Sequence, residues 1–408
     1  MRSLSTAARV AAPFLVALTL AACQEPTGVG LGLIDDDTST PAARELPATS
    51  ATLRSAATTT GGFAAGGTPA QSRVLVGSVV DAVYGDATAV GYLDASSPTA
   101  GRPTNFQDST ITAVALQLRF DDYDPVGPDT LAFYVYGDPT APLPVEVREV
   151  TASWAPTDLA VDTTLPTGDV IATATISPAD TTVTIDLAPS WVAANLDKIR
   201  SSDFVTAFEG FEVRVPDGTV AGAVRGFDAT QSAVLVATPG DTLRFPVNEV
   251  LTSLAQGAPA ATAGVLPLRA GRPEAVAFAF DFPSVGAVAL ARAELRLPLF
   301  RDGTGEAGFI RPLAREAILF GVAADSSRSQ PVFLRVPPSG DALTTDVSLL
   351  TPFVQDVLIG TQQFDRYEVT LATNPVSLDV FPVYATPPAG QRAPRFVLTV
   401  VGQPVQPS

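Results

Sequence analysis

Residues 181–215 read TTVTIDLAPSWVAANLDKIRSSDFVTAFEGFEVRV, and this stretch decides the fold class. Apolar and polar side chains alternate over 183–187 and again over 211–215, which is the period of a strand with one buried face. Between these runs, PSWVAANL at 189–196 predicts a short helix. The stretch therefore predicts the order strand, short helix, strand.

A looser copy of this pattern occupies residues 345–371, TDVSLLTPFVQDVLIGTQQFDRYEVTL, with strands expected over 345–349 and 367–371. Equivalent bulky residues lie at similar offsets, 162 residues from Trp191 to Phe353 and 163 from Leu235 to Leu398. Similar offsets in an unchanged order indicate a duplicated fold with loops of different length. The copies share an apolar skeleton, so binding residues are expected in the loops and outer faces that differ.

The composition favours an all-β chain built from many short elements. Of 408 residues, 46% are hydrophobic, and there are 36 Pro and 31 Gly, which together allow large cores and many turns. We predict two tandem jelly-roll-like β-sandwiches with a short helix in each, after a disordered N-terminal tether. The expected segments are a signal peptide at 1–22, a lipid-anchored flexible tether at 23–72, the first sandwich at 73–240, a linker or bridging segment at 241–272, the second sandwich at 273–402 and a tail at 403–408.

The N-terminus has the pattern of an export signal. Arg2 and Arg9 precede an apolar run at 10–20, and the sequence LAAC follows at 20–23. This junction resembles the lipobox of bacterial lipoproteins, which implies cleavage before Cys23 and acylation of that cysteine. The alternative is a plain secretory signal with an incidental cysteine. In lipoproteins of this kind an aspartate after the cysteine retains the protein in the inner membrane. The resemblance therefore implies that Gln24 favours location in the outer membrane.

Charge and residue inventory exclude several functions. The net charge is -17, and removal of residues 1–22 makes it two units more negative, so the surface repels nucleic acid. The chain has no histidine, and Cys23 is its only cysteine, so a Ser-His-Asp triad, a thiol nucleophile and an ordinary zinc site are excluded. A carboxylate pair of glycosidase type is the remaining catalytic option. We therefore expect a protein that is not an enzyme.

The order of the motifs is similar to that of β-sandwich modules of the DNRLRE type in secreted bacterial proteins, which are akin to carbohydrate-binding modules. The motifs that carry this resemblance lie at 115–120, 133–136, 154, 183–191 and 210–215. The front, with VGS at 76–78, Asp81, YG at 84–85 and Ala89, is also similar to a Bacteroidota family of lipoproteins of uncharacterised function. That family has Asp-Pro where this chain has Val80-Asp81-Ala82-Val83. Together the two resemblances cover most of residues 74–402.

Two sets of side chains are candidates for binding. Tyr134 and Tyr136 share one strand face, opposite Phe133 and Val135, and an outward pair would form a platform for glycan stacking; the alternative is packing under a loop. Four aspartates surround a Pro/Gly turn and would supply oxygen ligands for a structural calcium ion; the alternative is a solvated turn. These aspartates are Asp121, Asp122, Asp124 and Asp129.

The expected function is that of a cell-envelope lipoprotein, anchored in the lipid bilayer of the outer membrane through acylated Cys23. It would act as a non-enzymatic binding module that recognises glycan at the membrane surface. The alternative is a structural or assembly subunit that contacts another envelope protein through an edge strand. A carboxylate-based glycoside hydrolase is the more remote alternative. Apart from structural calcium, no cofactor is expected.

Overall fold

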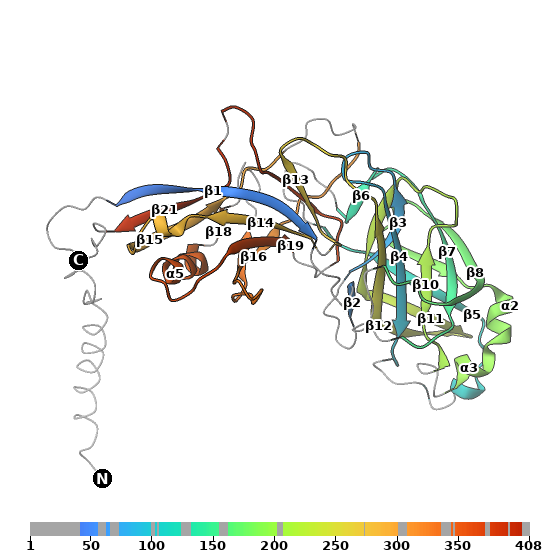
Figure 1. Ribbon diagram of the computed structural model, residues 1–408. Helices are drawn as coiled ribbons and strands as arrows, with labels where there is room; N and C mark the ends of the chain where they lie inside the picture. Colours follow the sequence, from blue (N-terminus) through green and yellow to red (C-terminus); the bar gives the residue numbers. More distant parts are fainter. Residues whose placement is uncertain are drawn as a thin grey trace, which may run out of the picture.

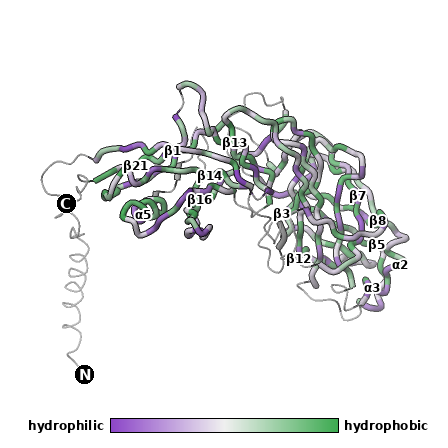
Figure 2. The backbone as a smooth tube through the Cα atoms, in the orientation of Figure 1, coloured by the Kyte–Doolittle hydropathy of each residue, from purple (hydrophilic) through white to green (hydrophobic). Residues whose placement is uncertain are grey.

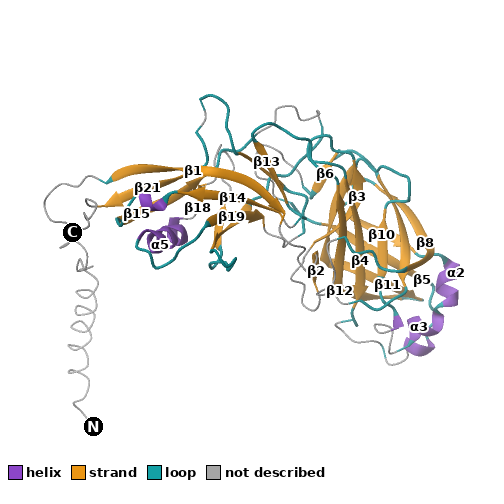
Figure 3. Ribbon diagram, in the orientation of Figure 1, coloured by secondary structure: helices purple, strands orange, loops and turns teal. Residues whose placement is uncertain are grey.

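The computed structural model describes residues 41–55, 63–65, 73–98, 103, 106–123, 132–154, 162–201, 207–272, 274–300, 308–335, 344–345, 347–371, 376–390 and 392–401. The predicted signal peptide, Cys23, Asp124, Asp129 and the tail at 403–408 lie outside these residues. The described chain is mostly antiparallel β-sheet with a few short helices, which confirms the all-β prediction (Figure 3). The sheets form two units, each with its own hydrophobic core.

The first unit comprises residues 63–256. Its elements are β2 (Phe63–Ala65), β3 (Arg73–Val79), β4 (Ala87–Ala95), η2 (Phe106–Asp108), β5 (Ala113–Phe120), β6 (Val135–Gly137), β7 (Leu143–Val150), β8 (Thr167–Ile176), β9 (Thr182–Asp186), α2 (Pro189–Ala194), α3 (Leu196–Arg200), β10 (Phe211–Arg214), β11 (Ala223–Thr238) and β12 (Asp241–Gln256). The strand order is β2-β12-β11-β3-β4-β10-β7-β8, with β5 and β6 also paired to β11 and β9 paired to β5.

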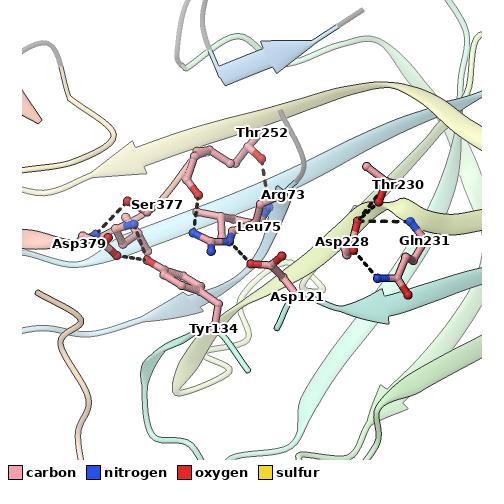
Figure 4. Close-up of polar contacts among 12 residues, drawn as sticks. Arg73, Leu75, Asp121, Tyr134, Asp228, Thr230, Gln231, Thr252, Ser377 and Asp379 are labelled. Atoms are coloured by element: carbon pink, nitrogen blue, oxygen red, sulfur yellow. Dashed lines mark hydrogen bonds and ion pairs between the residues drawn. The ribbon is translucent and has the colours of Figure 1, made fainter. Parts of the chain in front are cut away.

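Strand β11 joins the two faces of this unit. Its first half pairs with β3 and its second half with β12, and its pairing with β5 shifts register between Asp228 and Ala233. The Asp228 carboxylate stabilises this irregularity by accepting hydrogen bonds from the Thr230 amide and the Gln231 side chain, both at 2.8 Å (Figure 4). A bulge of this kind bends a strand, and it allows β11 to serve both faces.

The stretch at 181–215 forms the predicted strand, helix and strand, as β9, α2 with α3, and β10. Trp191 is 9% exposed and packs with its ring centroid 5.4 Å from that of Phe208 and 5.8 Å from that of Phe211. Its indole N–H donates to Glu149 Oε2 at 2.8 Å. The tryptophan is therefore a core residue with a satisfied polar group.

The second unit comprises residues 42–55 and 265–401. Its elements are β1 (Ala42–Ser55), β13 (Val265–Arg269), β14 (Glu274–Phe280), η4 (Phe282–Ser284), β15 (Ala289–Arg296), β16 (Glu316–Val322), β17 (Val332–Arg335), β18 (Thr344–Thr345), α5 (Val347–Leu358), β19 (Arg366–Leu371), β20 (Val380–Tyr384) and β21 (Arg395–Val401). One sheet has the order β15-β21-β1-β14-β19-β16-β17-β18, and β13 pairs with β20 in another.

Helix α5 replaces the strand that was expected over 345–349, so that prediction is wrong. Leu350, Phe353, Val354 and Leu358 are buried, and their spacing of three to four residues is the period of a helix with one apolar face. This face packs against β15 and the sheet above it, and Figure 2 shows the largely hydrophobic colouring of the helix. The order strand, helix, strand is kept in the second unit, with a minimal first strand.

Strand β1 corrects the prediction of a flexible tether over 23–72. Residues 42–55 lie inside the second sheet, where β1 pairs with β21 along one side and with β14 along the other (Figure 1). Residues 63–65 also form a strand, which pairs with β12. Leu46 faces the core and is 5% exposed. Backbone hydrogen bonds on both sides hold this segment, although its side chains are mostly small.

The boundary between the units also differs from the prediction. Residues 241–256, which were expected in a linker or bridging segment, form β12 and pair with β11 and β4 of the first unit. Phe245 and Val250 lie in the core of that unit. Residues 265–269 form β13 of the second unit. The connection from the first unit to β13 is therefore confined to residues 257–264.

Candidate binding site

Tyr134 and Tyr136 are buried between the two units, with 0% and 3% of their surface exposed. They do point away from the core of the first unit, but residues 376–380 of the second unit cover them. Gly137 and Ile310 extend this contact by exchanging two backbone hydrogen bonds of 2.9 and 2.8 Å. The prediction of an exposed glycan platform is therefore wrong, because the second unit packs on that face.

A polar network surrounds Tyr134 at this junction (Figure 4). Its hydroxyl donates to Asp379 at 3.0 Å and accepts from the Leu378 amide at 2.6 Å, and the Arg73 guanidinium lies 4.1 Å from the ring centre. Arg73 also donates to the Val376 carbonyl at 3.2 Å. Burial raises the pKa of Asp379 to about 6, although Arg73 and Tyr134 oppose the shift. The network joins both units through buried charged groups.

The predicted calcium site is not formed by the aspartates that the structure describes. Asp121 is half-buried and binds Arg73, with Nε 2.6 Å from Oδ2, so a guanidinium group already pairs with this carboxylate. The side chain of Asp122 is 72% exposed and lies 3.6 Å from Arg119. Among the described residues, no group of three or more acidic side chains is arranged to hold a metal ion. This prediction is corrected for Asp121 and Asp122.

Asp81 is the carboxylate that accepts the most hydrogen bonds among those described at the junction of the two units. It accepts hydrogen bonds from the Val83 and Tyr84 amides at 2.7 and 3.1 Å, and from the Tyr136 hydroxyl. Arg311 of the second unit donates two more, at 2.8 and 2.9 Å. Burial alone would raise the pKa of Asp81, but these hydrogen bonds outweigh burial and lower it. Asp81 therefore stays ionised and ties the units together.

A cavity of about 500 Å³ opens on the second unit. Its walls come from two segments, 280–287 after β14 and 357–367 at the end of α5 and the start of β19. The rings of Phe280, Phe282, Phe364 and Tyr367 line it. Gly321 on β16 allows Phe364 to lie there, because a Cβ atom at position 321 would overlap the ring. The volume is in the range of ligand pockets.

The polar groups of this aromatic pocket are few. Tyr367 is 2% exposed and, within the part of the chain that the structure describes, its hydroxyl has no hydrogen-bond partner. Burial raises the pKa of Tyr367, so the hydroxyl stays protonated and remains a donor. Gln362 Oε1 is buried and has no hydrogen-bond partner among the described residues, while its Nε2 donates to Asp356 at 3.4 Å. The pocket thus has apolar walls and a few polar atoms that are able to form a hydrogen bond with a ligand.

Sequence reasoning missed this pocket. Its aromatic residues have the pattern of ordinary core positions. Phe278, Phe280 and Phe282 alternate with small residues and with Asp281, and Tyr367 belongs to a second alternating strand. One available signal was the segment GTQQFDRY at 360–367, which places aromatic and amide side chains directly after a helix. The tertiary structure brings this segment against residues 280–287.

A pair of acidic residues lies at another part of the first unit. Asp94 on β4 is directly opposite Glu249 on β12. Burial, with a smaller contribution from the charges of Glu249 and Glu209, raises the pKa of Asp94 to about 7, while a 2.8 Å hydrogen bond from the Ala95 amide opposes the shift. Like charges opposite each other destabilise a sheet. No sequence pattern marks this pair, since strand pairing creates it.

The Asp94 pair makes stability depend on pH. The folded state keeps the proton up to about pH 7, whereas the unfolded chain releases it near the ordinary aspartate pKa of 3.8, so the free energy of unfolding falls as pH rises between these values. We expect Asp94→Asn to be more stable than the parent by about 1–3 kcal/mol at pH 8, and equal to it at pH 3.5. Urea unfolding at both pH values measures this difference. An equal effect of the substitution at both pH values would contradict the assignment.

No protein-family model matches the chain, and no curated protein matches it. Among the helices that the structure describes, none has the length and apolar character needed to cross a membrane.

Proposed function

We propose that the chain is a lipoprotein of the bacterial cell envelope, held at the outer membrane through acylated Cys23, and that it acts as a non-enzymatic binding module. The sequence LAAC at 20–23 supports the anchor. The aromatic pocket of the second unit carries the binding proposal, because about 500 Å³ of space is lined by four rings, one of which bears a hydroxyl without a hydrogen-bond partner among the described residues. Such a site accepts an apolar ligand group with a hydrogen-bond acceptor.

The direct test uses residues 23–408 with Cys23→Ser and the neutral fluorescent probe N-phenyl-1-naphthylamine. We expect saturable binding that weakens at least about tenfold in Ala287→Trp, because Ala287 is exposed at the pocket wall and an indole there fills the space. The matched control is Ala289→Trp, which replaces an exposed alanine that does not line the pocket. Absence of saturable binding, or equal loss in both variants, would contradict the proposed function.

Tyr367→Phe separates the hydroxyl from the apolar walls. Since the hydroxyl has no partner among the described residues, its removal should change the free energy of unfolding by less than about 0.5 kcal/mol. Binding of a naphthyl ketone should weaken about two- to tenfold, which corresponds to one hydrogen bond, while binding of naphthalene should not change. Fluorescence titration of both ligands measures the difference. Equal weakening for both ligands would show that the hydroxyl does not contact the carbonyl group.

A further inference from the structure

The aromatic pocket lies close to the point where the N-terminal segment enters the second unit. Ala42, the first residue of β1, pairs with Val400 of β21, and Ala289 at the start of β15 pairs with Val401. Arg44 donates to the Val285 carbonyl at 3.4 Å, and Val285 belongs to the segment that forms the pocket wall. The entry of the chain and the pocket therefore share one end of the unit.

Two exposed apolar side chains, Ile359 and Val401, lie at this end. Ile359 is 56% exposed and stands between Leu358 and Gly360, which both line the pocket. Val401 is 37% exposed at the end of β21. Large apolar side chains that are exposed next to an apolar pocket mark a site of contact with an apolar phase or partner.

The distance to the membrane follows from the proposed anchor at Cys23. Residues 24–41 span at most roughly 60 Å when fully extended, at about 3.3–3.6 Å per residue. The end that carries the pocket therefore stays within reach of the lipid surface. The first unit is inserted between β1 and β13 in the sequence of the second unit. A lipid is consequently the ligand that meets this pocket most often.

The side chains that line the pocket indicate which part of a lipid molecule it binds. Among the residues that the structure describes, its lining contains no lysine or arginine, and Asp365 is exposed at its edge, so an anionic phosphate is not recognised there. Aromatic walls suit a hydrocarbon chain, and the Tyr367 hydroxyl suits an ester carbonyl as acceptor.

We infer that the aromatic pocket binds an acyl chain of a bilayer phospholipid, drawn from the membrane to which the chain is anchored. This inference rests on the proposed function and specifies its ligand. The acyl chain lies between residues 280–287 and 357–367, and Ile359 inserts at the lipid surface beside it. Association with zwitterionic membranes then depends on apolar contacts and depends little on salt.

The experiment uses residues 23–408 with Cys23→Ser, N-phenyl-1-naphthylamine as the bound probe, and lysophosphatidylcholine below its micelle concentration as the competitor. We expect the competitor to displace the probe, and the chain to float with phosphatidylcholine vesicles. Ile359→Glu should reduce flotation at least about fivefold and leave probe binding within twofold. The matched control, Val220→Glu, changes a 63% exposed valine of the first unit and should alter neither result.

The possible results distinguish failure of the acyl-chain assignment from failure of the proposed binding function. Probe binding that lysophosphatidylcholine does not displace would overturn the acyl-chain assignment and leave the binding function intact. Failure of the probe to bind would overturn both. If the acylated full chain binds no probe in detergent whereas the Cys23→Ser chain binds it, the anchor's own acyl chain fills the pocket, and the assignment to a bilayer lipid is wrong.

Discussion

Replacing Asp81 with alanine is expected to lower the free energy of unfolding by about 3–5 kcal/mol. The substitution leaves the Arg311 guanidinium without its bidentate partner at the junction, where the Arg311 side chain is only 14% exposed. It also removes the acceptor of the Tyr136 hydroxyl and of two backbone amides. Buried donors that lose their acceptor carry a large desolvation cost. Urea unfolding at pH 7 measures the effect.

The control for this prediction is Asp122→Ala, since the Asp122 side chain is 72% exposed and its ion pair with Arg119 is long, at 3.6 Å. We expect it to cost less than about 0.5 kcal/mol. Adding Arg311→Met to Asp81→Ala should recover part of the loss, because no unpaired charge then remains buried. A loss below about 1 kcal/mol for Asp81→Ala would show that the junction does not depend on this carboxylate.

The lowered pKa of Asp81 adds a pH dependence to the same contact. The folded state favours the ionised carboxylate more than the unfolded state does. The resulting stability is therefore present above the unfolded pKa and is lost as pH falls through the lower pKa of the folded state. This dependence has the opposite sign to that expected for Asp94.

Deletion of residues 42–55 is expected to abolish cooperative folding of the second unit. Strand β1 separates β21 from β14, so its loss leaves unpaired backbone groups along both neighbours and opens the core at Leu46. The effect should exceed about 5 kcal/mol, which is comparable with the whole stability of a domain. Limited proteolysis should then cleave within 265–401 while a fragment over 73–256 persists.

Two point substitutions on β1 provide the matched comparison. Leu46→Asp places a charge in the core and should cost several kcal/mol, on the order of 3 or more. Thr52→Asp changes an exposed residue of the same strand and should cost less than about 1 kcal/mol. A synthetic peptide of residues 42–55, added to the deletion variant, should restore part of the protection. Unchanged protection of 265–401 after the deletion would show that β1 is dispensable.

The candidate site was only partly predictable. The alternation at 133–136 put Tyr134 and Tyr136 on one strand face, opposite Phe133 and Val135, but it carried no information about residues 376–380, which cover that face. Asp81 stood in a recognisable motif, yet its main partner, Arg311, is 230 residues away. The aromatic pocket had no local pattern of its own, because its walls come from two segments that meet only in the folded unit.

The all-β class and the order strand, helix, strand in residues 181–215 followed from the sequence alone. Both depend on the spacing of apolar residues two to four positions apart, which is a local property. The position of β1 was decided only in the tertiary structure. Its hydrogen bonds are made by the backbone, which is nearly the same for every residue, and its partners Val400 and Phe280 lie hundreds of residues away from it. Local patterns therefore determine which segments become strands, and packing of the whole chain determines which strands pair and which faces remain open to a ligand.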